Sequence, residues 1–363
     1  MDNVAHTLVG AALGRAVADR KVPGAALLGA LAGNAPDWTE LLVSPEAVAP
    51  RFGPPSPSPY LLYHRGITHS LVGAVVETLA LTLLVGLGTR WWTRRRAGSP
   101  APPWGRLAAC IGITVLSHLY MDWQGSYGLR PFLPWDATWY YGDWVAIVDP
   151  FFWLVPLIAL AWGTERHWIP LAAAAVVGGT TSFALVRAAT FVAPWVLVAY
   201  AALSVVGLIG WVGYWFGPVA GRRVASLALL VLALYAGAQG AVAQIEKAKV
   251  RRVAELRFGA GARWAALTRV GWPFTWEPVY ANADTVAGDD WRLARHLDAP
   301  IVVRVLRETP EGRAMGQFAR FLAAEVDSTG GSGGGRAATV YLRDARYART
   351  GRDGWGVLSV KVD

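Results

Sequence analysis

The segment YHRGITHS holds two histidines, His64 and His69, whose imidazoles could bind a metal ion. Five residues turn an ideal helix by about 140°, so the two side chains would not share one helical face. Gly66 between them favours a loop from which His64 approaches, while Thr68 or His69 begins a helix. We therefore expect the two imidazoles to converge from a loop and a first helical turn.

A second pair, His118 and Asp122 in the segment SHLYMDW, has the four-residue spacing that places both side chains on one face of a helix. Such a pair can chelate one divalent ion, or one side chain can bind the ion while the other orients it. A helix-end salt bridge or cap explains the pair alone equally well. His6 and Asp37, taken singly, are typical of a polar group near a helix start and of an N-cap.

Other charged residues near these motifs have two interpretations each. The planar guanidinium of Arg65 would suit an anionic oxygen, particularly that of a phosphate. Considered without its neighbours, Arg65 is better interpreted as a surface residue at the level of the lipid headgroups. Asp143 and Asp149 are candidates for carboxylates that orient a ligand or act in catalysis. Asp149 is also typical of a helix start, and Asp136 of a loop.

The composition indicates that these residues belong to a polytopic membrane protein. Of the 363 residues, 54% are hydrophobic and 16% are charged, which is more apolar than ordinary soluble proteins. Six apolar runs are each close to the roughly 20 residues that a helix needs to cross a bilayer. These expected spans are residues 71–89, 105–121, 147–163, 168–187, 193–216 and 224–243.

Two shorter apolar stretches, residues 4–17 and 22–35, precede the expected spans and predict a half-buried helical hairpin. We expect no cleavable signal peptide, because the first residues carry Asp2 and no basic region.

Basic residues concentrate in alternate connections between the apolar runs. They are Arg15, Arg20, Lys21, Arg90, Arg94, Arg95, Arg96, Arg106, Arg166, Arg222 and Arg223. The positive-inside rule places these connections in the cytoplasm, and it places the opposite helix ends and residues 244–363 outside it. The net charge of +9 therefore reports orientation, and we expect no nucleic-acid partner.

Six possible ligands then fall at helix ends on the extracytoplasmic side. They are His6, Asp37, His64, His69, His118 and Asp122. Ionisable groups near hydrocarbon are costly and tend to be kept for function, so this grouping favours a metal site. The single cysteine, Cys110, lies within an apolar run, so the ligands must be nitrogen and oxygen. An imidazole-rich set suits zinc.

The chain after the last span predicts a small soluble domain. The predicted parts are an all-α helical membrane domain over residues 1–243, a charged linker helix over 244–258 and a soluble α+β domain over 259–363. Strand-like composition marks IVVRVL, ATVYLRDARY and WGVLSVKVD, and an apolar helical stripe is marked by Met315, Phe318 and Leu322. STGGSGGGR predicts a flexible loop. GWPFTWEP suits core packing, with a lid or a membrane-surface contact as alternatives.

In combination, these motifs resemble a known family. The N-terminal histidine, N-x-PD at residues 34–37, HRGxTHS at 64–70, HLxxD followed by SYG and PF, and VDP at 148–150 are similar to the YdjM-like bacterial membrane-bound metal-dependent hydrolases. The specific motifs cover roughly residues 1–165. The resemblance implies a bacterial inner-membrane protein. Through a relationship to zinc-dependent phospholipase C and P1 nuclease, it also implies an all-helical catalytic core with clustered zinc ions.

Position by position, the resemblance marks the ligands His6, Asp37, His64, His69, His118 and Asp122. The chain departs from it at one place. Many relatives carry a second carboxylate two residues after the PD aspartate, where this chain has Thr39. Glu40 must then substitute, or that ligand is missing.

We hypothesise a hydrolase in which one or two divalent ions, zinc foremost and manganese as an alternative, activate a water and polarise a phosphoryl or acyl oxygen. Asp37 and Asp122 would act as ligands or in catalysis, with Asp122 as a base, and Arg65 would bind the developing negative charge. A site beside lipid headgroups makes the bilayer the expected partner and a phospholipid or other phosphoester the expected substrate. One alternative is a non-catalytic membrane protein with a structural metal. The other is a divalent-metal transporter, but transport sites tend to lie near the bilayer midplane, whereas these ligands lie at helix ends.

Overall fold

The computed structural model describes residues 1–18, 22–43, 60–61, 63–95, 101–164, 168–328 and 338–362. The chain forms two compact units. The first comprises Met1–Thr39, Ile67–Val242 and Thr268–Thr275, and the second comprises Glu40–Gly66, Ala243–Leu267 and Trp276–Asp363. Several residues used in the sequence predictions lie outside the described part: Arg20, Lys21, Arg96, Arg166 and nearly all of the glycine-rich segment 328–336.

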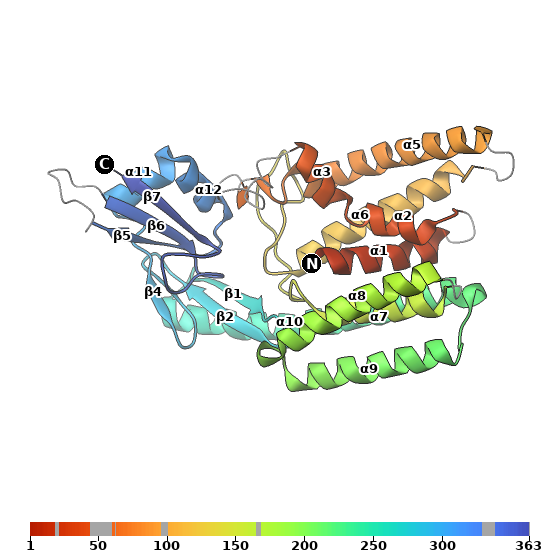
Figure 1. Cartoon of the computed structure of the whole chain (residues 1–363). Coiled ribbons are helices and arrows are strands. Elements are labelled where there is room, and N and C mark those ends of the chain that lie inside the picture. Colours follow the sequence, from red (N-terminus) through yellow and green to blue (C-terminus); the bar gives the residue numbers. More distant parts are fainter. Residues whose placement is uncertain are drawn as a thin grey trace. The chain divides into compact units, whose positions relative to one another are not determined.

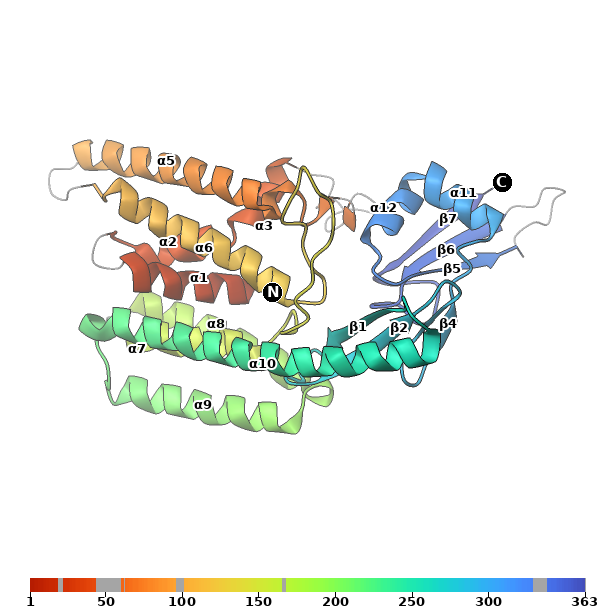
Figure 2. The ribbon, with the colours of Figure 1, turned by 180° about the vertical axis from the view of Figure 1, so that it is seen from behind.

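The first unit is built from helices in two layers. Its helices are α1 (Asn3–Ala18), α2 (Ala25–Ala32), the start of α3 (Ala35–Val43), α5 (Leu71–Arg95), α6 (Trp104–Gln124), α7 (Pro150–Trp162), α8 (Trp168–Arg187), α9 (Pro194–Val212) and the first part of α10 (Gly221–Phe258). Figures 1 and 2 show α1, α2, α5 and α6 side by side in one layer, with α7, α8, α9 and α10 in the other.

The six expected spans all form helices, but the structure does not confirm six crossings. Among the described residues, three helices are long and apolar enough to span a membrane, namely α5, α9 and α10. The 13 residues of α7 extend about 20 Å, which is less than the roughly 30 Å hydrocarbon core. α6 has 21 residues but carries Arg106, His118 and Asp122, and the apolar described part of α8 is limited to Ala172–Arg187.

Glycines hold α1 and α2 in close contact, as the predicted helical hairpin. A Cβ on Gly10 would overlap the carbonyl oxygen of Gly29, and a Cβ on Gly14 would overlap that of Ala25. Small residues four positions apart allow helix backbones to approach in this way. The hairpin fixes where both helices end, and these ends carry residues of the candidate site.

A serine cap starts α5 directly after the 3₁₀ turn η3 (Ile67–His69). The backbone N–H of Gly73 donates to Ser70 Oγ at 3.0 Å, which satisfies an amide that the first helical turn leaves free. A Cβ on Gly73 would overlap the carbonyl oxygen of Ile67, so glycine allows the turn to fold against the helix start. His64 lies in a turn before η3, as predicted, and His69 at the end of η3 is fully buried.

An aspartate cap starts α7 in the other layer. The backbone N–H of Phe151 donates to Asp149 Oδ1 at 2.9 Å, and Pro150 occupies the first helical position, where no N–H is needed. Tyr235 of α10 donates to Asp149 Oδ2 at 2.8 Å. Asp149 therefore has the helix-start role considered for it and also ties α10 to α7.

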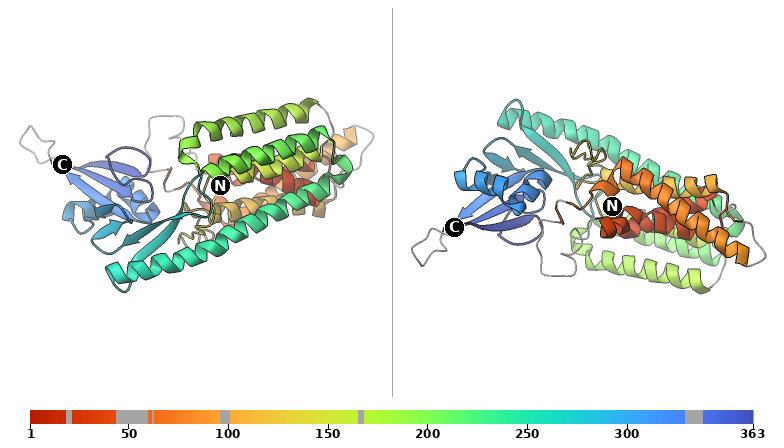
Figure 3. Two further views of the ribbon diagram at one scale, coloured as in Figure 1. Left: turned by 90° about the horizontal axis from the view of Figure 1, so that it is seen from below. Right: turned by 90° about the horizontal axis from the view of Figure 1, so that it is seen from above.

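Among its described residues, the second unit contains the end of α10, two β-sheets and the two short helices between them (Figure 3). One sheet has the order β1 (Arg263–Thr268), β2 (Trp276–Ala281), β3 (Thr285–Ala287) and β4 (Arg292–Ala294). The other is antiparallel, with the order β5 (Leu322–Asp327), β6 (Ala338–Asp344) and β7 (Val357–Val362). The helices are α11 (Pro300–Glu308) and α12 (Pro310–Phe318).

Two predictions for this unit are wrong. IVVRVL forms α11 and not a strand. Pro300 occupies the start of the helix, and Val302 and Val305, which are three residues apart, are buried on one helical face. Leu322 begins β5 and does not continue the helical stripe, since α12 ends at Phe318. ATVYLRDARY and WGVLSVKVD supply β6 and β7, as predicted.

Candidate metal centre

Five of the six predicted ligands lie close together in the first unit and form two overlapping groups. One group is His6, His118 and Asp122, and the other is Asp37, His69 and His118. Within each group, one nitrogen or oxygen from each residue lies within 4.8 Å of the others. These residues come from α1, α3, η3 and α6, so the fold gathers side chains that are far apart in the sequence. We call these five residues the donor cluster.

Asp122 lies among three imidazoles. Its Oδ1 is 3.3 Å from His6 Nε2, and its Oδ2 is 3.6 Å from the Nε2 atoms of both His69 and His118. The amino terminus of Met1 also contacts Asp122 Oδ1, at 2.5 Å. The His6 and His118 rings stack with their centroids 3.8 Å apart. The ε nitrogens of the three histidines therefore face the Asp122 carboxylate.

Hydrogen bonds hold the far ring nitrogens of two histidines. His118 Nδ1 lies 2.7 Å from the carbonyl oxygen of Gly33 and must donate to it, since a carbonyl can only accept. A histidine that donates through Nδ1 can present the lone pair of Nε2 to a metal ion. His69 Nδ1 lies 3.0 Å from Thr68 Oγ1. Both imidazoles are thus oriented with Nε2 toward the cluster.

Asp37 completes the donor cluster from the first turn of α3. Its Oδ1 is 3.3 Å from His69 Nε2, and its Oδ2 accepts a hydrogen bond from Asn3 Nδ2 at 2.7 Å. Burial raises the pKa of the Asp37 carboxyl, but when His118 is protonated and His69 Nε2 carries a proton, the charge of His118 and the hydrogen bond from His69 outweigh it and hold that pKa well below its usual range. Its side chain is 18% exposed, whereas those of His69 and Asp122 are at most 2% exposed.

The donor cluster suits a divalent metal ion by its chemistry. His69 Nε2 and His118 Nε2 lie 3.2 Å apart, so their lone pairs face each other unless a proton or a cation lies nearby. Buried polar atoms are costly without a partner. Imidazole nitrogens with carboxylate oxygens are a typical ligand set for zinc and also bind manganese. The residues present therefore fit such an ion.

The sixth predicted ligand, His64, is in neither group of the donor cluster and belongs to the second unit. Its Nδ1 lies 3.0 Å from Glu40 Oε2, and the Tyr60 ring stacks on its imidazole at a centroid distance of 4.4 Å. Glu40, the expected substitute ligand, therefore pairs with His64. Arg65 is buried and has a left-handed φ of 53°. Metal binding by His64 and anion binding by Arg65 stay predictions.

A buried carboxylate that the motifs did not reveal lies on α5. Glu77 is 6% exposed, and the hydroxyl of Thr39 donates to its Oε1. The signal for it was present in the sequence, because Glu77 is the only acidic residue of the apolar run 71–89. Ionisable residues in such runs are rare and tend to be functional.

The remaining predicted carboxylates have local roles or separate positions. Asp136 accepts hydrogen bonds from the backbone N–H and the hydroxyl of Thr138 at 2.8 and 2.6 Å, as a loop acid. Asp143 is buried, with a left-handed φ of 50°. Neither belongs to the groups found among the described residues.

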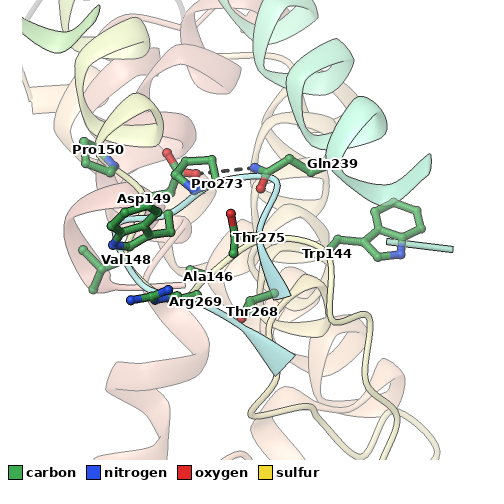
Figure 4. A pocket seen from close by; sticks show the side chains of 12 residues that line it. Trp144, Ala146, Val148, Asp149, Pro150, Gln239, Thr268, Arg269, Pro273 and Thr275 are labelled. Atoms are coloured by element: carbon green, nitrogen blue, oxygen red, sulfur yellow. Dashed lines mark hydrogen bonds between the residues drawn. The ribbon is translucent and has the colours of Figure 1, made fainter. Parts of the chain in front are cut away.

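A small pocket lies elsewhere in the first unit, beside the turn between β1 and β2. Figure 4 shows Asp149 and Gln239 hydrogen-bonded at its edge, at 3.5 Å. Gln239 Oε1 also accepts from the backbone N–H of Phe274 at 3.3 Å, and Trp272 Nε1 donates to the Phe191 carbonyl at 2.9 Å. These hydrogen bonds hold the segment GWPFT in place, but Phe274 is 39% exposed, so the core interpretation of that segment and its alternatives stay predictions.

The family model described as YdjM inner membrane protein matches residues 1–245. No curated protein and no solved structure matches the chain. The matched region covers more than half of the chain and contains every residue of the donor cluster.

Proposed function

We propose that this chain, which belongs to the YdjM inner membrane protein family, is a membrane-bound hydrolase that uses a divalent metal ion. Three described helices that are long and apolar enough to span a bilayer support the membrane setting. The substrate class that we propose is a phosphoester at the membrane interface, such as a phospholipid or a lipid-linked phosphodiester.

The observation that carries this proposal is the convergence of the donor cluster. His6 and Asp122 are separated by 116 positions, yet Nε2 and Oδ1 are 3.3 Å apart and buried. Gathering ionisable groups in an apolar surrounding is costly. A bound cation would offset this cost, which supports metal binding over an incidental polar cluster.

The geometry favours one ion in the donor cluster. The two groups share His118, whose Nδ1 is engaged by Gly33, so only its Nε2 is free to bind metal. One nitrogen lone pair serves one ion. A second ion would need ligands beyond these five.

The chemistry of each residue follows from its position. A divalent ion supplies Lewis-acid character, which polarises a phosphoryl oxygen and lowers the pKa of a nearby water. Asp122, surrounded by imidazoles, would hold the ion or accept a proton from the attacking water. Asp37 is the partly exposed member of the donor cluster, so it would lie on the side that substrate approaches. Arg65 belongs to the second unit, and its proposed role, binding of the anionic group of the substrate, rests on its side-chain chemistry alone.

A structural metal site is the second candidate, and the burial of the donor cluster favours it. His6, His69, His118 and Asp122 are each at most 2% exposed. Structural zinc sites are closed by four protein ligands, whereas catalytic sites keep one position open. The exposed edge of Asp37 is the observation that favours the catalytic candidate.

The proposal is tested by metal analysis followed by an activity screen. Full-length protein purified in detergent should contain near-stoichiometric zinc or manganese by mass spectrometry, and His118→Ala should lose it because a central ligand is removed. His296→Ala serves as control, since His296 is exposed in the second unit. His64→Ala tests whether the sixth predicted ligand takes part.

Activity separates the two candidates. Metal-loaded protein should hydrolyse a phospholipid or a model phosphodiester, and Asp122→Asn should not. Metal binding without hydrolysis of either substrate class would favour the structural candidate. Wild-type protein that stays free of metal after zinc and manganese are added would refute both.

A further inference from the structure

We infer that Glu77 is part of the metal site, as an ionised carboxylate that strengthens the binding of the cation from outside the donor cluster. This inference rests on the proposed metal site and deepens it. None of the sequence motifs includes Glu77, and it is not in either group of the donor cluster.

The first observation is the environment of the Glu77 carboxylate. Its Oε1 accepts a hydrogen bond from Thr39, whereas its Oε2 is buried and has no hydrogen-bond partner among the described residues. A buried carboxylate oxygen without a donor is costly. In an apolar helix such a group calls for a compensating positive charge.

The second observation is the position of Glu77 relative to the donor cluster. Ser70, Gly73, Ala74 and Glu77 follow the spacing of one helical face and are all buried, so this face of α5 points inward. The same face begins directly after His69. Thr39, which bonds to Glu77, is two residues from Asp37 on α3.

The third observation is electrostatic. Both His118 and Asp37 of the donor cluster interact through charge with the Glu77 carboxylate: a protonated His118 attracts it, and the ionised Asp37 repels it. Burial alone would favour the protonated, neutral carboxyl. A dication in the donor cluster reverses this preference, because Coulomb attraction is strong where water is excluded. Glu77 and the ion would therefore stabilise each other without direct contact.

Glu77→Gln distinguishes this role from that of a neutral buried side chain. Glutamine has the shape of a protonated glutamate, so the substitution is silent if Glu77 is neutral and removes a charge if it is ionised. We expect the affinity of the full-length, metal-stripped protein for Zn²⁺ and for Mn²⁺ to fall about 10- to 100-fold, as for other groups that support metal ligands. Competition with a chelating dye measures it.

A charge swap tests whether the position of the charge matters. Because Thr39 Oγ1 contacts Glu77 Oε1, an aspartate at position 39 would place its carboxylate next to the position that the Glu77 carboxylate occupies. Thr39→Asp in the Glu77→Gln background should therefore recover most of the lost affinity. Thr82→Val is the matched control, since Thr82 is a buried polar residue on the same helix. Thermal unfolding of each variant checks folding.

The outcomes distinguish the role inferred for Glu77 from the proposed metal site on which it rests. Weaker metal binding by Glu77→Gln, recovery in the double variant and no change in Thr82→Val support the role of Glu77. Unchanged affinity of a folded Glu77→Gln protein overturns the inference while the metal site stands. Absence of metal binding by the wild type overturns both.

Discussion

The orientation of single imidazoles decides whether the donor cluster can bind an ion. His118 donates from Nδ1 to Gly33, and His69 Nδ1 lies beside the Thr68 hydroxyl. Such bonds to the far nitrogen fix the ring and raise its basicity as a ligand. The backbone carbonyl cannot be removed by substitution, but the hydroxyl can.

Thr68→Val should weaken zinc binding about tenfold or more, because His69 loses the partner that holds its ring. Thr68→Ser keeps the hydroxyl and should bind zinc like the wild type. Both affinities can be measured by dye competition on stripped protein. Equal weakening in the two variants would mean that packing of the threonine methyl, and not the hydroxyl, matters.

At this scale the sequence predicted six ligands, because residue type and spacing carry ligand chemistry, and five of them form the donor cluster while His64 lies in the second unit. It missed how Glu40 would be used, since the pairing of Glu40 with His64 depends on a turn that no local pattern specifies. Glu77 carried a visible signal, a lone acid in an apolar run. Its bond to Thr39 joins α5 to α3 and could not be predicted from spacing.

The α1–α2 hairpin is the element on which the donor cluster depends most. α1 carries His6, and Gly33 at the end of α2 accepts the bond from His118. Close packing through Gly10 and Gly29 sets the distance between them. A side chain at this contact would separate the two helices.

Gly29→Ala should therefore destabilise the protein by about 1–3 kcal/mol through overpacking and should also weaken metal binding. The matched control is Gly237→Ala on α10, where an added Cβ meets nothing within 4 Å. That variant should be as stable as the wild type or slightly more so, since alanine favours helix. Thermal unfolding in detergent measures both, and equal stability of the two variants would contradict the packing account.

Other elements show where local pattern fails. Apolar runs predicted the positions of the helices because a helix in a membrane must be apolar over its length. IVVRVL has strand-like composition, but burial of Val302 and Val305 on one face makes it a helix. Tertiary contacts decide such short segments, and they override the preference of β-branched residues.

For the whole molecule, the family match and three apolar helices support an inner-membrane protein. The orientation of the helices in the membrane determines on which side the donor cluster lies. The positive-inside rule predicts the extracytoplasmic side, which is also the side that the proposed lipid substrate class would reach from the outer leaflet.

Cysteine labelling tests this orientation, and the single cysteine makes it simple. In a Cys110→Ala background, Ala137→Cys should react with a membrane-impermeant maleimide in intact bacterial spheroplasts. Arg223→Cys should react only after permeabilisation. Both positions are exposed in the structure. The reverse pattern would place the donor cluster at the cytoplasmic face.

The most direct measurement for the central claim is X-ray absorption at the zinc edge of the purified, zinc-loaded protein. The structure predicts a shell of nitrogen and oxygen at about 2.0–2.2 Å, with the outer scattering of two or three imidazoles and none from sulfur. His118→Ala should reduce the imidazole signal or abolish binding. A shell of oxygen alone, without imidazole scattering, would show that zinc binds elsewhere and would contradict the donor cluster as the metal site.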